Sequence, residues 1–201
     1  MKNFLNLVFI FFIIISPIDG YSEDNIVKSK VFIEQLGQKV MGKVSNPKIT
    51  DTQRHTNFRD IYLSSFDSYY ISKFVLGRHW KSLDENLQKR FINTFNDYVV
   101  ATYAPKFKGW GGKVKALNST LNKNYYNVLT SIINEKGPIL NLQWKIYLNK
   151  NNKFKILDVN IDGVSMLVTQ RAEFSAVIKN NPKGVSGLIE AMERKTKSSG
   201  S

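Results

Sequence analysis

Apolar residues recur at helical spacing between residues 24 and 105, and polar residues mark where helices are expected to begin. Asp24 is expected to cap a helix that runs to about Val44. Thr50 stands three residues before Gln53, which is the spacing of a capping box, so a second helix is predicted to follow. The apolar face of the first helix is predicted to contain Val27, Val31, Leu36, Val40 and Val44.

Two further helices complete this helical half. Asp67 predicts the N-cap of a short helix, and Gly77 suits the left-handed residue at its end. Ser82 and Glu85 have capping-box spacing for a longer helix, which Pro105 ends. The apolar stripe of that helix has two phenylalanines one turn apart and consists of Leu87, Phe91, Phe95, Tyr98 and Thr102.

The second half of the chain changes to the period of two that is typical of β-strands. Strands are predicted over residues 113–117, 125–133, 140–148 and 154–161. In the third strand alternate residues are apolar and point to one face. The fourth strand slips phase near Ile156, which indicates a bulge that bends the sheet.

Helices return after the last strand. Ser165 is expected to cap a helix that ends near Ile178, and Asn181-Pro182 separates it from a final helix over 183–195. Helices, an antiparallel meander and helices again predict an α+β fold. We expect one domain over residues 23–196, followed by a disordered tail over 197–201.

The chain begins with the pattern of a secretory signal peptide over residues 1–22. Lys2 precedes an apolar run of about 12 residues, which is short beside the roughly 20 residues of a membrane-spanning helix. Small residues lead up to a cleavage site near Ser22. Cleavage predicts export to the periplasm, and an uncleaved membrane anchor is the alternative.

The charge and the cysteine content of the chain restrict which partners and which kinds of site are possible. The chain has 29 basic and 16 acidic residues, a net charge of +13 and no cysteine. Export argues against nucleic acid as the partner of this charge and leaves anionic lipid surfaces, acidic glycans and acidic protein faces. The absence of cysteine excludes thiol catalysis, iron–sulfur ligation and zinc sites built on sulfur.

No sequence motif indicates catalysis. Gly109–Lys113 fits neither a dinucleotide fingerprint nor a phosphate loop. Gly163-Val164-Ser165 begins like a nucleophile elbow, but Leu167 replaces the second glycine, so a helix cap is the better interpretation of the serine. His55 and His79 are interpreted as surface residues, and no metal ligands or cofactor are expected.

Three charged residues leave alternatives open. Asp158 or Asp162 is a candidate general base in a cone-shaped fold, but we favour a structural role in which Asp162 caps the next helix and Asp158 faces a lysine. Arg171 stands on a helix with apolar neighbours. It is expected to pair with an internal carboxylate or, alternatively, to meet a bound anion such as a head group.

Three blocks of residues, in this order, resemble a known family. The first two blocks contain Phe66-Asp67, Val75-Leu76-Gly77 and Trp80, then Phe91, Phe95 and Thr102-Tyr103-Ala104. The most specific block contains Asp158-Val159, Ile161-Asp162-Gly163-Val164-Ser165, Arg171 and Phe174. Behind a signal peptide, this order is similar to that of the MlaC-type periplasmic phospholipid-binding proteins, also called the toluene-tolerance auxiliary family. One departure is Gln170, where the family often has an aromatic residue.

The resemblance implies a fold and a function. The fold is a curved antiparallel sheet of about four to five strands backed by helices, cone-like and with an apolar pocket. The function is that of a carrier between two membranes, which exchanges phospholipid with an outer-membrane lipoprotein–porin complex and an inner-membrane ABC transporter complex. It also implies transient contact with membrane surfaces and no enzymatic activity.

The pocket is expected between the aromatic face of the long helix and the curled sheet. The predicted lipid-binding residues are Phe91, Phe95, Val99, Tyr103, Trp144, Ile146, Val159, Ile161, Leu167 and Phe174. Two alternative functions remain. A cone-fold enzyme predicts a carboxylate in the pocket, and a basic envelope adaptor that binds no lipid predicts a filled core.

Overall fold

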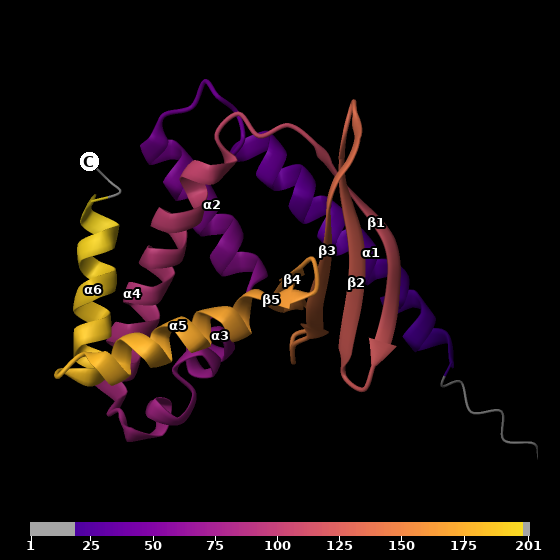
Figure 1. Cartoon of the computed structure of the whole chain (residues 1–201). Coiled ribbons are helices and arrows are strands. Elements are labelled where there is room, and N and C mark those ends of the chain that lie inside the picture. Colours follow the sequence, from indigo (N-terminus) through magenta and orange to yellow (C-terminus); the bar gives the residue numbers. More distant parts are fainter. Residues whose placement is uncertain (1–18, 199–201) are drawn as a thin grey trace, which may run out of the picture.

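The computed structural model describes residues 19–198, in which helices precede and follow an antiparallel sheet (Figure 1). The elements in chain order are α1 (Asp19–Lys43), α2 (Asp51–Ser65), α3 (Ser68–Leu76), the 3₁₀ helix η1 (Gly77–Ser82), α4 (Glu85–Tyr103), the 3₁₀ helix η2 (Ala104–Phe107), β1 (Lys113–Asn122), β2 (Tyr125–Asn134), β3 (Gly137–Leu148), β4 (Phe154–Ile161), β5 (Val164–Ser165), α5 (Met166–Asn180) and α6 (Gly184–Ser198). This order confirms the predicted α+β fold. Within residues 19–198, none of the helices combines the length and the apolar character that crossing a bilayer requires.

The strands form one open sheet in the order β1-β2-β3-β4-β5, and each strand pairs antiparallel with the next. In β4, Ile156 and Asp158 pair with consecutive residues of β3, so Leu157 is an extra residue between them. This bulge confirms the phase slip predicted near Ile156. Further register breaks lie at Leu117 in β1 and at Ile139 in β3. Bulges increase the local twist of a strand, so the sheet curls and has a concave face.

Two apolar clusters are built around this sheet. One joins α1 and α2 to the concave face, and its buried members are Ile33, Leu36, Val44, Ile61, Tyr126, Val128, Ile146 and Ile156. The other joins helices α3 to α6 and includes Ile71, Val75, Leu76, Trp80, Phe91, Phe95, Leu167, Phe174, Ile178 and Ile189. Figure 1 shows α4 and α6 side by side and away from the sheet, while α1 follows β1.

Asp67 links the start of α3 to the sheet by hydrogen bonds to β3 and β4. Its backbone N–H donates to the carbonyl oxygen of Ile156 at 2.9 Å. One oxygen of its side chain accepts the Tyr70 N–H at 2.9 Å, which confirms its predicted role as the N-cap of α3. The other oxygen accepts a hydrogen bond from the Tyr147 hydroxyl of β3. Burial, followed by this hydrogen bond, raises the pKa of Tyr147 to about 12.

Local capping signals were a good but incomplete guide to helix starts. The Thr50 capping box of α2 and the Ser165 cap of α5 are confirmed. The prediction for Asp24 is wrong, because α1 begins earlier and Asp24 lies inside it. The prediction for Ser82 is also wrong. Asp84, adjacent to the helix, caps α4 by accepting a backbone N–H at 2.8 Å, while the Ser82 hydroxyl donates to a carbonyl within η1.

Contacts between α1 and β1 explain a third wrong prediction, which concerns the apolar face of α1. Val27 and Val31, assigned to the apolar face of α1, are 53% and 43% exposed. A polar residue occupies the inner face instead, because the Ser29 hydroxyl forms a hydrogen bond of 2.7 Å with that of Ser119 in β1. Another polar contact follows along the helix, where a carboxylate oxygen of Glu34 accepts the backbone N–H of Ala116 at 2.9 Å.

Several boundaries also differ from the prediction. The predicted signal peptide lies outside the described residues up to position 18, and residues 19–22 form the start of α1. Strand β1 continues beyond the predicted 113–117 to Asn122, and β3 begins at Gly137 and not at Leu140. Helix α6 continues to Ser198, and residues 199–201 lie outside the description.

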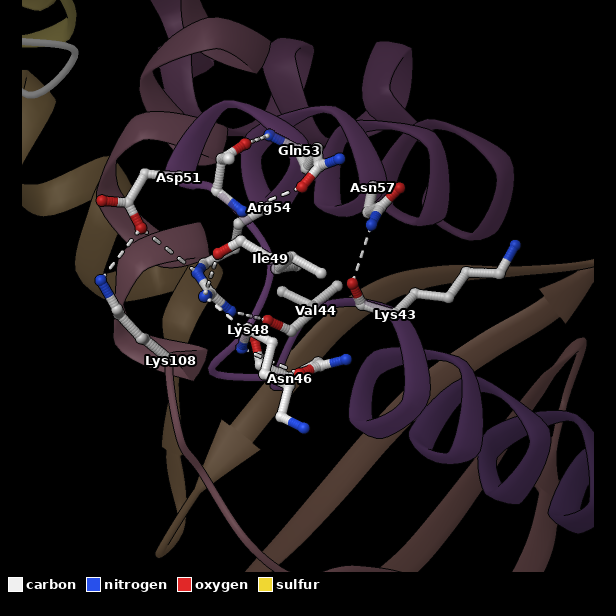
Figure 2. Close-up of polar contacts among 11 residues, drawn as sticks. Lys43, Val44, Asn46, Lys48, Ile49, Asp51, Gln53, Arg54, Asn57 and Lys108 are labelled. Atoms are coloured by element: carbon white, nitrogen blue, oxygen red, sulfur yellow. Dashed lines mark hydrogen bonds and ion pairs between the residues drawn. The ribbon is translucent and has the colours of Figure 1, made fainter.

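Arg54 of α2 is completely buried and holds the turn that leads from α1 to α2 (Figure 2). Its guanidinium donates to the carbonyl oxygens of Val44, Asn46 and Ile49, the last two at 3.1 and 3.5 Å. The Asp51 carboxylate lies 3.6 Å from its Nε. The carbonyl groups at the end of a helix have no partner within the helix, so Arg54 completes the C-terminal end of α1 from a neighbouring helix.

The substitution Arg54→Met is expected to lower the free energy of unfolding by about 2–4 kcal/mol, because it leaves buried carbonyl oxygens without donors. Arg59→Met is the matched control. Arg59 also lies on α2, but its ion pair with Asp97 is well exposed to solvent, so the expected change is within about 1 kcal/mol. Urea unfolding followed by circular dichroism measures both, and equal losses would contradict the role of Arg54.

Candidate functional site

A partly open cavity of about 570 Å³ lies between the concave face of the sheet and the helices. Its helical wall includes Leu36, Val40, Phe58, Ile61, Tyr62, Phe95, Val99, Tyr103, Met166 and Leu167. Its sheet wall includes Val114, Ile132, Leu140, Leu142, Trp144, Leu157, Val159 and Ile161. The volume is within the roughly 300–1,000 Å³ of ligand pockets, and the walls are overwhelmingly apolar.

Regular periodicity places the side chains of each wall. On α4, Phe95 and Val99 are four residues apart and Tyr103 is four further on, so all three share one stripe. On β3, alternate residues point into the cavity, and Trp144 is the largest of them. The Trp144 indole N–H donates to the Thr130 hydroxyl at 2.9 Å. Because that donor is satisfied within the protein, the ring offers the cavity an apolar surface.

Most of the predicted lipid-binding residues meet at this cavity, and three do not. The lining includes Phe95, Val99, Tyr103, Trp144, Val159, Ile161 and Leu167. Phe91 and Phe174 pack against each other in the helical cluster, with ring centroids 6.2 Å apart. Ile146 is fully buried between the sheet and α1. These three pack within the two clusters and are not part of the lining, although they follow the same periodic stripes as residues that are.

Helices α1 and α2 also contribute to the cavity, and the sequence pattern did not predict this. Leu36 and Val40 of α1 and Phe58 and Ile61 of α2 line the cavity, and their helical spacing was visible but indistinguishable from that of ordinary core residues. Gly37 is the one local signal. A Cβ atom there would come within 2.5 Å of the Val114 side chain, so the glycine lets α1 approach β1 closely.

The carboxylate at the cavity wall is held by the protein itself. Asp158 lines the cavity, and its oxygens accept hydrogen bonds from the Ser165 hydroxyl at 2.6 Å and the Leu167 N–H at 3.1 Å. Asp158 therefore anchors the start of α5, and the prediction of this role for Asp162 is wrong. Asp162 is exposed in a turn with φ of 49°. Within residues 19–198, no group of three or more His, Cys, Asp or Glu residues is arranged to hold a metal ion.

Arg171 differs from its predicted environment. Its guanidinium lies 5.3 Å from the ring centre of Phe74 and packs against Gly77 at the end of α3. In the described part of the chain, no carboxylate lies within ion-pair distance of it, so the expected internal pair is not present. A Cβ atom on Gly77 would lie 2.6 Å from the guanidinium, and its φ of 55° also favours glycine. Two of the blocks that carried the family resemblance thus meet at this contact.

The curled open sheet, its covering helices and the partly open apolar cavity define an α+β protein built around a binding cavity. The chain belongs to the MlaC family, since the family model described as "MlaC protein" matches residues 34–194, which confirms the resemblance. A solved structure of a phospholipid-binding protein from Ralstonia solanacearum, in complex with a phospholipid, has a TM-score of 0.75. It shares 17% identity, covering 86% of this chain and 98% of that one, so the likeness concerns the fold. No curated protein matches this chain.

The contact of Arg171 with Gly77 is testable by a double-mutant cycle. In Gly77→Ala the guanidinium must leave the Phe74 ring, so the stability loss includes backbone strain and about 0.5–1 kcal/mol of lost stacking. In an Arg171→Ala background the stacking is already absent, so Gly77→Ala is expected to destabilise less. Urea unfolding of the two single variants and the double variant measures this coupling. Arg194→Ala, on α6, is the control: its stability loss and that of Gly77→Ala are expected to add. If the losses of Arg171→Ala and Gly77→Ala also add, the contact between these two residues is contradicted.

Proposed function

We propose that this protein is a periplasmic phospholipid carrier. It holds the acyl chains of a phospholipid in the cavity and shuttles the lipid between an outer-membrane lipoprotein–porin complex and an inner-membrane ABC transporter complex. The observation that carries the proposal is a partly open apolar cavity of about 570 Å³ in a chain of the MlaC family. The phospholipid in the complex of similar fold supports the choice of ligand.

The physical requirement on such a carrier is a large apolar wall. A lipid with two long chains exposes about 30 methylene groups, at about 0.8 kcal/mol each, so water opposes its extraction by about 25 kcal/mol. A carrier must offer most of that apolar contact without exceeding what the bilayer offers, since otherwise the lipid never leaves. Aromatic rings, aliphatic side chains and the flexible Met166 provide such a wall with little directional bonding.

The net charge of the chain supports the proposed transport between membrane surfaces and partner proteins. The net charge of +13 favours approach to anionic membrane surfaces and to acidic docking faces of partner proteins. Such attraction acts over about a Debye length, so it weakens as salt is raised. The predicted signal peptide is consistent with export to the periplasm, where a soluble lipid carrier between two membranes has its role.

The alternative functions have less support. An adaptor that binds no lipid predicted a filled core, and the cavity argues against it. A cone-fold enzyme predicted a carboxylate in the pocket. Asp158 does line the cavity, but its oxygens are engaged in starting α5. We therefore assign a binding and transport role and no catalytic residue.

Native mass spectrometry of the protein purified from an envelope extract tests the proposal directly. We expect phospholipid to co-purify at about one molecule per chain, because the cavity offers one continuous apolar site. Protein that has been stripped of lipid, refolded and exposed to vesicles is the companion sample, and it is expected to recover the same mass. Repeated absence of lipid from both samples would overturn the carrier function.

A larger residue inside the cavity should displace lipid without unfolding the protein. Val99→Trp places a ring into the space on α4, and bound lipid is expected to fall at least about fivefold. Val177→Trp is the matched control, since Val177 lies on α5 outside the lining and is 38% exposed. Lipid per chain from native mass spectrometry and thermal unfolding measure the two effects. Unchanged lipid content in a folded Val99→Trp protein would contradict the location of the site.

A further inference from the structure

The cavity wall includes one positive charge. Lys106, in η2 where α4 ends, is the only Lys or Arg among the lining residues of the described chain. Its ammonium lies 5.0 Å from the ring centre of Tyr103, which also lines the cavity. The side chain is exposed, and no carboxylate within residues 19–198 forms an ion pair with it. The ring thus holds the ammonium at the rim, where a ligand phosphate can reach it.

A negative charge borders the same rim from α5. Gln170 lines the cavity, and its amide donates to a carboxylate oxygen of Glu173 at 3.1 Å. Phe174, the next residue on α5, packs against Tyr98 of α4 with ring centroids 6.2 Å apart, so this part of α5 lies beside α4. The Glu173 carboxylate adds to burial and to Tyr98 in raising the pKa of Tyr103. Glu173 is also exposed and has no ion pair in the described chain. The described chain therefore has two charges of opposite sign without an ion-pair partner at this cavity, a cation of η2 next to Tyr103 and an anion of α5 hydrogen-bonded to the lining residue Gln170.

We infer that these two residues bind the head group of a zwitterionic, amine-bearing phospholipid, with the phosphate at Lys106 and the ammonium at Glu173. The inference rests on the proposed function, which places the acyl chains in the cavity and the head group at its rim. In an ethanolamine head group the two charges are only a short alkyl chain apart, and each finds its opposite at the rim. A glycerol head group offers Glu173 no cation and brings its phosphate near a carboxylate, so it is disfavoured.

Competitive loading tests the inference. The full-length exported protein is stripped of lipid and exposed to vesicles that contain equal amounts of phosphatidylethanolamine and phosphatidylglycerol, and bound lipids are identified by native mass spectrometry. We expect the wild type to prefer the ethanolamine lipid by about threefold, as exposed charge pairs allow. Glu173→Gln is expected to abolish the preference without changing total lipid. Lys106→Gln is expected to lower the retention of both lipids, and Lys106→Arg to restore it.

Matched controls separate local from general charge effects. Lys89→Gln and Glu85→Gln remove exposed charges of α4 outside the cavity lining, and they should leave both occupancy and preference unchanged. Wild-type protein that takes up no lipid would overturn the proposed function and this inference together. Wild-type protein that takes up both lipids equally, or a Glu173→Gln variant that keeps the preference, would overturn only the inference. Unchanged lipid retention in Lys106→Gln would overturn the assignment of the phosphate.

Discussion

The attachment of α3 to the sheet through Asp67 is the interaction that ties the helical part of the fold to β3 and β4 beside the cavity. A single residue ends the turn between α2 and α3, caps α3, donates to the carbonyl oxygen of Ile156 in β4 and accepts the Tyr147 hydroxyl of β3. The bulge at Leu157 lies directly beside the Ile156 contact. The helical cluster and the sheet cluster are therefore joined where α3 meets β4, and a further contact, the ion pair of Arg59 with Asp97, joins α2 to α4. The cavity lies between these contacts and is lined by residues of both clusters.

Such a space is unfavourable for the folded state unless other parts of the protein compensate for it. Side chains that face an unfilled space lose van der Waals contacts on one side. Here the loss is balanced by two well-packed clusters, one between α1, α2 and the sheet and the other among α3 to α6. Buried polar contacts such as those of Arg54 fix the turn between the first two helices. The two packed clusters thus keep the walls of the cavity apart. An apolar ligand that enters and leaves needs such a space.

Sequence patterns predicted elements well and the cavity only in part. Helix starts at Thr50, Asp67 and Ser165 follow from local hydrogen bonds, which sequence spacing encodes directly. Phe91 and Phe95 share one helical stripe, yet only Phe95 lines the cavity. Periodicity distinguishes inside from outside, but tertiary packing decides whether an inward residue meets a neighbour or a void. The transfer of the capping role from Asp162 to Asp158 has the same origin, because hydrogen bonds between β4 and the start of α5 decide which carboxylate engages the helix.

The exposed edge of the sheet determines how readily this chain can pair with other polypeptides. Strand β1 is an edge strand, and a free edge is a template on which another polypeptide can add a strand. Here one of its N–H groups is occupied by the Glu34 carboxylate, the ladder is broken at Leu117, and exposed Lys113 and Lys115 flank the site. An incoming strand meets neither a continuous row of donors and acceptors nor a neutral surface. The edge is thereby protected against pairing with a strand of another chain, and so against edge-to-edge aggregation.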